Sequence, residues 1–177
     1  MPADRFVEAL TAQIGREFGA SQQYLAVAVW YEGQTFPRLA SLFYAQALEE
    51  RDHALMMVKY LLDSGLEPKL PGVAEPKSSF ADVVEPISVA LEQERRVTDQ
   101  ISELASVARE ENDYVSEQFV QWFLKEQVEE IDLFSSLLDV AERSRERPMD
   151  IEEYLAREGG AGGGGDPTAP PVAGASS

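Results

Sequence analysis

Glu50 and His53, the only histidine of the chain, interrupt an apolar stripe with two groups that can bind a proton or a metal ion. They are three residues apart, so on a helix both side chains point to the same side. The residues that step by three and four around them are Leu39, Phe43, Ala47, Met57 and Tyr60. Burying ionisable groups is costly unless they are paired, hydrogen-bonded or bound to a metal. The pair therefore predicts a buried site that needs a compensating group.

Three other stretches with helical periodicity carry polar residues near the middle of an apolar stripe. These residues are Glu17, Glu94, Gln127 and Glu130. Four helices of similar length, packed side by side, would bring all six side chains into one layer. Four carboxylates in a small apolar volume cannot all stay ionised without a counter-charge. Because no Lys or Arg lies on the inward stripes, metal cations are the natural candidates.

The residue types of this layer narrow the choice of metal. Carboxylates with one imidazole and no sulfur suit iron or manganese better than copper or structural zinc. A Glu from each of two helices and an inward i, i+3 pair from each of the others is typical of carboxylate di-metal proteins. Because the second pair is Gln127 and Glu130 rather than Glu and His, we expect the second metal ion to bind more weakly. Weak binding suits a protein that passes iron onward.

Four further residues are candidates beside this layer. Tyr24 follows Glu17 by seven residues and should lie on the same face, where it could hydrogen-bond a metal-bound oxygen species, supply an electron or simply fill space. Glu49, Glu126 and Glu129 flank the central residues in sequence and could form a third, wetter cation site. They could equally be ordinary solvated glutamates.

Four long helices must position these side chains. The expected ranges are about 5–33, 35–65 and 82–112, then a fourth helix from Asp113 to before Pro148 and a short fifth helix at 151–157. Asp4 is the expected N-cap of the first helix, and Asp82 with Glu85 resembles a capping box for the third. The connection 66–81 can extend about 50 Å, enough to run along a helix of about 40 Å. We therefore expect an all-α four-helix bundle whose second and third helices are parallel.

Composition bounds the remaining possibilities. The 177 residues suffice for one domain, expected at 1–158, and the Gly/Pro/Ala/Ser-rich segment 159–177 is expected to be flexible. With 32 acidic and 15 basic residues the formal charge is −17, which disfavours nucleic acid and anionic membranes. The absence of cysteine excludes disulfides, Fe–S clusters and thiol catalysis. Neither a membrane span nor a signal-peptide core is present, so a cytoplasmic protein is expected.

With these motifs the chain resembles the ferritins, specifically the non-haem bacterial type. The resemblance covers about residues 5–157, and its ligand motif is specific as a set. That set is Glu17, Glu50-x-x-His53, Glu94 and Gln127-x-x-Glu130. The resemblance implies that Fe(II) is oxidised by O2 or H2O2 and stored as a ferric mineral inside a hollow shell of twenty-four identical subunits.

The resemblance also implies roles for individual residues. One iron would be held by Glu17, Glu50 and His53, and the other by Glu50, Glu94 and Glu130, with Glu50 as the bridge. Gln127 would sit beside the pair, and a third site would join Glu130 to Glu49, Glu126 and Glu129. Haem is not expected by this resemblance. The haem-containing bacterioferritins have a methionine at the position where this chain has Arg51.

Three alternatives have to be weighed against this interpretation. A DNA-protecting miniature ferritin places its iron site between subunits and would want a basic terminal arm, which this chain lacks. A di-iron oxidase or oxygenase would need a retained metal pair and a pocket for an organic substrate. A helical interaction protein would use the central polar layer only to fix the register of its helices.

Overall fold

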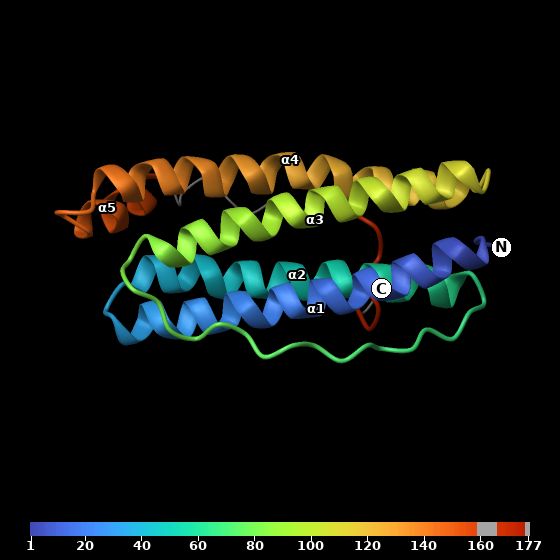
Figure 1. The fold of residues 1–177 in the computed structure, drawn as a ribbon, viewed down its shortest axis with the longest axis horizontal. Coiled ribbons are helices and arrows are strands. Elements are labelled where there is room, and N and C mark those ends of the chain that lie inside the picture. Colours follow the sequence, from blue (N-terminus) through green and yellow to red (C-terminus); the bar gives the residue numbers. More distant parts are fainter. Residues whose placement is uncertain (159–165, 176–177) are drawn as a thin grey trace.

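The computed structural model describes residues 1–158 and 166–175, and every regular element among them is a helix. The helices are α1 Asp4–Gly33, α2 Pro37–Asp63, α3 Glu85–Glu110, α4 Tyr114–Arg143 and α5 Met149–Glu158. The four long helices form a bundle and α5 lies across one end of it (Figure 1). The predicted fold class is therefore confirmed. In the part of the chain that the structure describes, no helix combines the length and apolar character needed to span a membrane.

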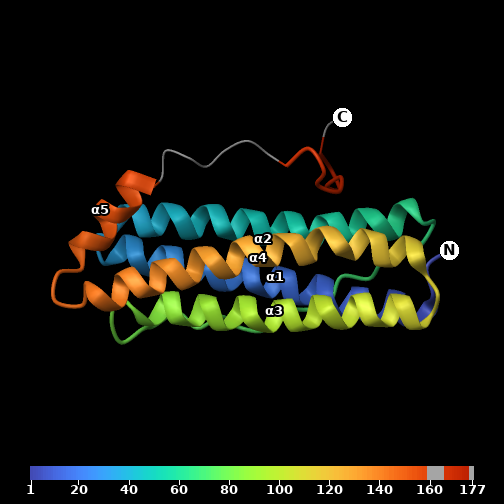
Figure 2. The same ribbon diagram turned by 90° about the horizontal axis from the view of Figure 1, so that it is seen from above.

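The bundle has the predicted parallel pair. α1 packs along α2, α3 packs along α4, and α1 also contacts α3. The segment between α2 and α3 runs along the whole outer side of the bundle beside α1, so that α2 and α3 point the same way (Figures 1 and 2). This crossover lies so close to α1 that a Cβ atom on Gly15 would stand 2.9 Å from Cβ of Pro71.

Predicted helix starts differ from the structure by one to three residues, and the fifth helix begins at Met149 rather than at Ile151. Asp4 is the first residue of α1 rather than its N-cap, which is Ala3. α2 begins at Pro37 because Thr35 has a φ of +66° and a residue before proline avoids the helical region. α3 begins at Glu85, and Asp82 caps it from outside by accepting from the N–H groups of Val84 and Glu85 at 2.9 Å.

Two predicted turn residues have the expected conformations. Gly65 follows the end of α2 with a φ of +78°, which is readily adopted only by glycine. Asp113 is the N-cap of α4, and its carboxylate accepts a hydrogen bond from the N–H of Ser116 at 3.1 Å. Asp113 also accepts from the N–H of Ala3, which ties the N-terminus to the turn between α3 and α4.

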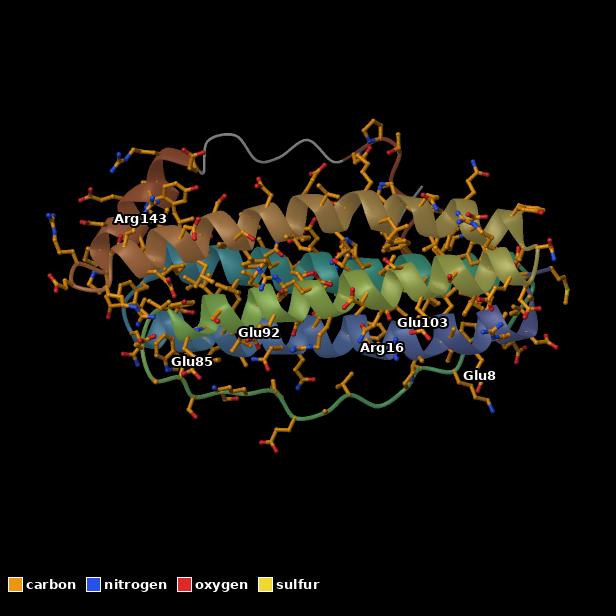
Figure 3. All side chains as sticks on the ribbon, turned by 45° about the horizontal axis from the view of Figure 1, so that its top comes forward. Glu8, Arg16, Glu85, Glu92, Glu103 and Arg143 are labelled. Carbon is orange, nitrogen blue, oxygen red and sulfur yellow. The ribbon has the colours of Figure 1, made fainter. Side chains whose placement is uncertain are left out.

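The apolar core is divided into two clusters along the bundle axis. One cluster contains Tyr31, Phe43 and Phe134, and the other contains Ile14 and Phe123. On each long helix the core residues change from one cluster to the other at the polar residues singled out by sequence. Charged side chains such as Glu8, Glu92 and Glu103 lie outside (Figure 3). The bundle thus holds a buried polar layer between two apolar halves.

Residues 166–175 lie alongside α2 and α4 (Figure 2). Oδ2 of Asp166 accepts from Nε1 of Trp122 at 3.2 Å and from Nζ of Lys125 at 2.9 Å, and the N–H of Ala173 donates to the carbonyl of Leu55 at 3.3 Å. The other residues of the expected flexible tail, 159–165 and 176–177, lie outside the described residues.

Candidate metal centre

The six side chains of the polar layer are all buried and come from all four long helices. Their exposed fractions are Glu17 1%, Glu50 1%, His53 3%, Glu94 0%, Gln127 3% and Glu130 4%. Helical spacing turns each of them inward, because every one replaces an apolar residue on the core-facing stripe of its helix. The fold therefore concentrates four carboxyl groups and one imidazole in a dry volume.

Glu17, Glu50 and His53 form the first group of candidate ligands. Each offers one ligand atom, and these three atoms lie within 4.8 Å of one another. Nδ1 of His53 is 3.5 Å from Oε2 of Glu50. The group combines two carboxylates from different helices with an imidazole, a donor set that suits a first-row divalent ion such as Fe(II).

Four buried carboxylate oxygens in this layer lack any hydrogen-bond partner among the described residues. They are Oε2 of Glu17, both oxygens of Glu50 and Oε2 of Glu130. A structural polar layer would pair such oxygens with donors, because a buried polar atom without a partner is destabilising. Cations bound in the layer would give these oxygens partners. The residues present therefore fit a metal better than a hydrogen-bonded register layer.

Glu94 differs from the other carboxylates because both of its oxygens accept hydrogen bonds. The hydroxyl of Tyr24 donates to Oε1. Nε2 of Gln127 donates to Oε2 at 3.0 Å and also lies 3.3 Å from Oγ1 of Thr98. Tyr24 and Gln127 thus act on the layer through Glu94, and both fix the position of its carboxylate.

Burial raises the pKa of the central carboxyl groups. For Glu17 and Glu50 burial is the largest cause, and the charges of neighbouring carboxylates raise the pKa further. Burial, followed by the charge of Glu49, raises the pKa of Glu130 to about 9. Burial and then the charge of Glu94 raise the pKa of Tyr24 well above its usual range. The metal-free layer therefore holds protons that an arriving cation would displace.

A second group of candidate ligands lies beside the first. One carboxylate oxygen from each of Glu49, Glu126 and Glu130 lies within 4.8 Å of the others. Glu49 and Glu126 are partly exposed and line a hollow of about 360 Å³ that also reaches His53. The structure does not bring Glu129 into this group, since Glu129 is exposed and lines a different hollow towards α5.

Two buried glutamines belong to the site although sequence reasoning missed them. Nε2 of Gln13 donates to Oε1 of Glu17 at 2.7 Å, and Nε2 of Gln46 donates to Oε2 of Glu49 at 3.0 Å. Gln13 precedes Glu17 by four residues and Gln46 precedes Glu50 by four. This repeated Gln-x-x-x-Glu spacing, which places both side chains on one helix face, was the available signal.

A sequence model described as a ferritin-like domain matches residues 7–144. The chain belongs to the ferritin family. Among relatives in this family, "Ferritin BfrB" of Mycolicibacterium smegmatis is 51% identical over 170 residues, which cover 96% of this chain and 93% of that protein. "Bacterial non-heme ferritin" of Staphylococcus aureus is 33% identical over 143 residues, 81% of this chain and 86% of that protein.

Solved ferritins share the fold. The open pore ferritin from Archaeoglobus fulgidus superposes with a TM-score of 0.84 at 27% sequence identity, covering 91% of this chain and 98% of that one. The resemblance drawn from the ligand motif is confirmed at the level of the family and its bacterial members.

Proposed function

We propose that this chain is an iron-storage ferritin that oxidises Fe(II) at a di-iron centre within each subunit and stores the ferric product in a hollow shell. The observation that carries the proposal is the set of buried, unpartnered oxygens of Glu17, Glu50 and Glu130, the first two of which lie in one group with His53. Membership of the ferritin family supports iron as the metal, and iron is then the substrate rather than a resident cofactor.

Two Fe(II) ions bind side by side in the layer. Glu17, Glu50 and His53 hold one ion, and Glu50, Glu94 and Glu130 hold the other, so that Glu50 lies between them. The oxygens of Glu94 already accept hydrogen bonds from Tyr24 and Gln127, which reduces their strength as ligands. The second ion is accordingly the weaker bound of the two.

Oxidation requires one electron from each Fe(II) ion. With O2 as oxidant, two electrons and two protons give H2O2; with H2O2 as oxidant, two electrons and two protons give two water molecules. The carboxylates favour the reaction because they stabilise the more highly charged Fe(III). Protons that the buried carboxyl groups release when Fe(II) binds are available for this step.

Glu130 connects this centre to the second acidic group. It belongs to the layer and also lies within reach of Glu49 and Glu126. A ferric ion can therefore move from the pair to these carboxylates without leaving Glu130. The exposed Glu129 lies next to Glu130 in sequence and adds negative charge on the outward side of this route.

The storage shell requires many copies of the chain, and we propose a homo-oligomer of twenty-four. The outer face of α1 supports assembly, because Leu25 and Val29 are 46% and 57% exposed. They line a hollow of about 430 Å³ together with Trp30 and Pro76 of the crossover. A second copy of the chain would bury this apolar surface.

An aerobic Fe(II) titration of metal-free protein tests the proposed function. We expect a fast oxidation phase that saturates near two irons per chain, followed by slower mineral growth. The Glu50→Ala variant should lose the fast phase, whereas Glu92→Ala, which changes an exposed glutamate of α3, should keep it. Oxidation at the rate of buffer alone in the unmodified protein would contradict the proposal.

A further inference from the structure

One buried amide lies at the boundary between the two groups of carboxylates. Gln46 is 5% exposed and precedes Glu49 and Glu50 by three and four residues on α2. Its Nε2 donates to Oε2 of Glu49 at 3.0 Å. Its Oε1 is buried and has no hydrogen-bond partner among residues 1–158 and 166–175.

The carboxylate that this amide contacts belongs to the second group of candidate ligands. One oxygen of Glu49 lies within 4.8 Å of carboxylate oxygens of Glu126 and Glu130 on α4. Gln46 therefore contacts one carboxylate of that group directly, on its own helix. An unpartnered carbonyl oxygen is thus buried directly beside a cluster of anionic ligands.

The chemistry of an amide suits this position in both states of the cluster. In the metal-free state Nε2 donates to the carboxylate of Glu49, which is favourable, whereas a further carboxylate would add repulsion. Rotation of the amide group about its last torsion angle would present Oε1 instead. This rotation gives up the hydrogen bond from Nε2 to Glu49 and no other, because Oε1 has no donor in the metal-free state. Amide carbonyl oxygens are established ligands of hard cations.

We propose that Gln46 is a fourth, neutral ligand of a cation held by Glu49, Glu126 and Glu130. Three carboxylates balance the charge of one Fe(III) ion, and a neutral fourth ligand completes its coordination without adding charge. The identity of the cation as iron rests on the proposed function, but the ligand role of Gln46 does not.

Zinc binding to metal-free protein tests the ligand role of Gln46 separately from the identity of the cation as iron. Zn(II) has no redox chemistry, so calorimetric titration counts sites without oxidation. We expect three Zn(II) ions per chain in the unmodified protein. Gln46→Leu should weaken the third site about tenfold and leave the other two unchanged, and Gln46→Glu should tighten the third site about threefold. Gln100→Leu is the matched control, because Gln100 also has a buried, unpartnered Oε1 but lies on α3 away from both groups.

Two results would overturn the inference. One is a third-site affinity within about twofold of the unmodified protein in both Gln46 variants. The other is unmodified protein that binds only two Zn(II) ions. Gln46→Glu keeps the shape of the side chain, so it gives an answer even if Gln46→Leu does not assemble. Failure of the proposed function is recognised separately, by the absence of a fast Fe(II) oxidation phase in the unmodified protein.

Discussion

The amide of Gln13 donates from Nε2 to Oε1 of Glu17 at 2.7 Å and leaves Oε2 of that carboxylate without a partner in the described chain. Oε1 of Gln13 in turn accepts from Nη1 of Arg16 at 3.1 Å. Gln13 is completely buried, whereas Arg16 is exposed (Figure 3). The contact fixes which oxygen of Glu17 faces the metal site.

Replacing Gln13 with Met should therefore weaken the tightest metal site. Methionine has a similar size but cannot donate, so the carboxylate of Glu17 loses its fixed orientation. We expect the affinity for the first Zn(II) ion to fall about tenfold, measured by calorimetry. Arg16→Met should change it far less, because the interactions of an exposed arginine are weak. An unchanged first-site affinity in the Gln13 variant would show that Glu17 is oriented by other contacts.

Gln127 should contribute to the stability of the metal-free protein through Glu94. Gln127→Leu removes the donor to Oε2 of Glu94, so this buried oxygen loses its hydrogen bond from Gln127. The free energy of unfolding should fall by about 1–3 kcal/mol in denaturant titrations of metal-free protein. Gln121→Leu, on an exposed position of the same helix, should stay within about 0.5 kcal/mol of the unmodified protein. Equal effects of the two changes would argue against the hydrogen bond.

Metal-free protein should become less stable as the pH rises from mildly acidic to mildly alkaline. The pKa of Glu130 is raised from 4.5 to about 9 in the folded chain, and the pKa values of Glu17 and Glu50 are raised as well. Between the unfolded and folded pKa values the folded state binds more protons. The stability that these groups contribute is therefore fully present below the unfolded pKa, and it is lost as the pH rises through the folded pKa. Each such group contributes about 1.4 kcal/mol per pH unit.

Thermal melts across this pH range with and without Zn(II) measure the effect. The metal-free melting temperature should fall with pH, whereas zinc-loaded protein should not show this fall, because bound metal keeps the carboxylates ionised. Glu130→Gln should reduce the slope of the metal-free protein. A metal-free melting temperature that rises steadily between the two pKa values would contradict the assignment of protons to this layer.

The contact between α1 and the crossover should distinguish two glycines of the same helix. A Cβ on Gly19 would meet no atom within 4 Å, whereas a Cβ on Gly15 would stand 2.9 Å from Pro71. Gly19→Ala should stabilise the protein by about 0.5–1 kcal/mol through helix propensity. Gly15→Ala should be less stable than Gly19→Ala by about 1 kcal/mol or more, because Pro71 has to move. Equal melting temperatures would show that the crossover yields freely.

Much of the fold and the core of the site could be predicted because the polar residues interrupt regular apolar stripes. Periodicity locates Glu17, Glu50 and His53 on inward faces, and a loop long enough to span the bundle fixes its topology. Helix starts were less predictable, since Pro37 moves one of them and Asp82 caps another from outside.

Residues whose roles depend on burial or on contacts between separate elements could not be assigned from the sequence. Gln13 and Gln46 resemble ordinary surface glutamines until burial and their carboxylate partners are known. The exposed side chain of Glu129 and the contact of Asp166 with Trp122 likewise depend on how α2 and α4 face their surroundings. Spacing along one helix cannot determine such relationships between separate elements.

Anomalous X-ray diffraction at the iron absorption edge, from crystals loaded anaerobically with Fe(II), tests the central claim most directly. It locates iron without relying on oxidation. We predict two neighbouring iron peaks inside each four-helix bundle, one beside Glu17 and His53 and one beside Glu94 and Glu130, with Glu50 between them. Iron found only at surface carboxylates, with the central layer free of anomalous signal, would contradict the account.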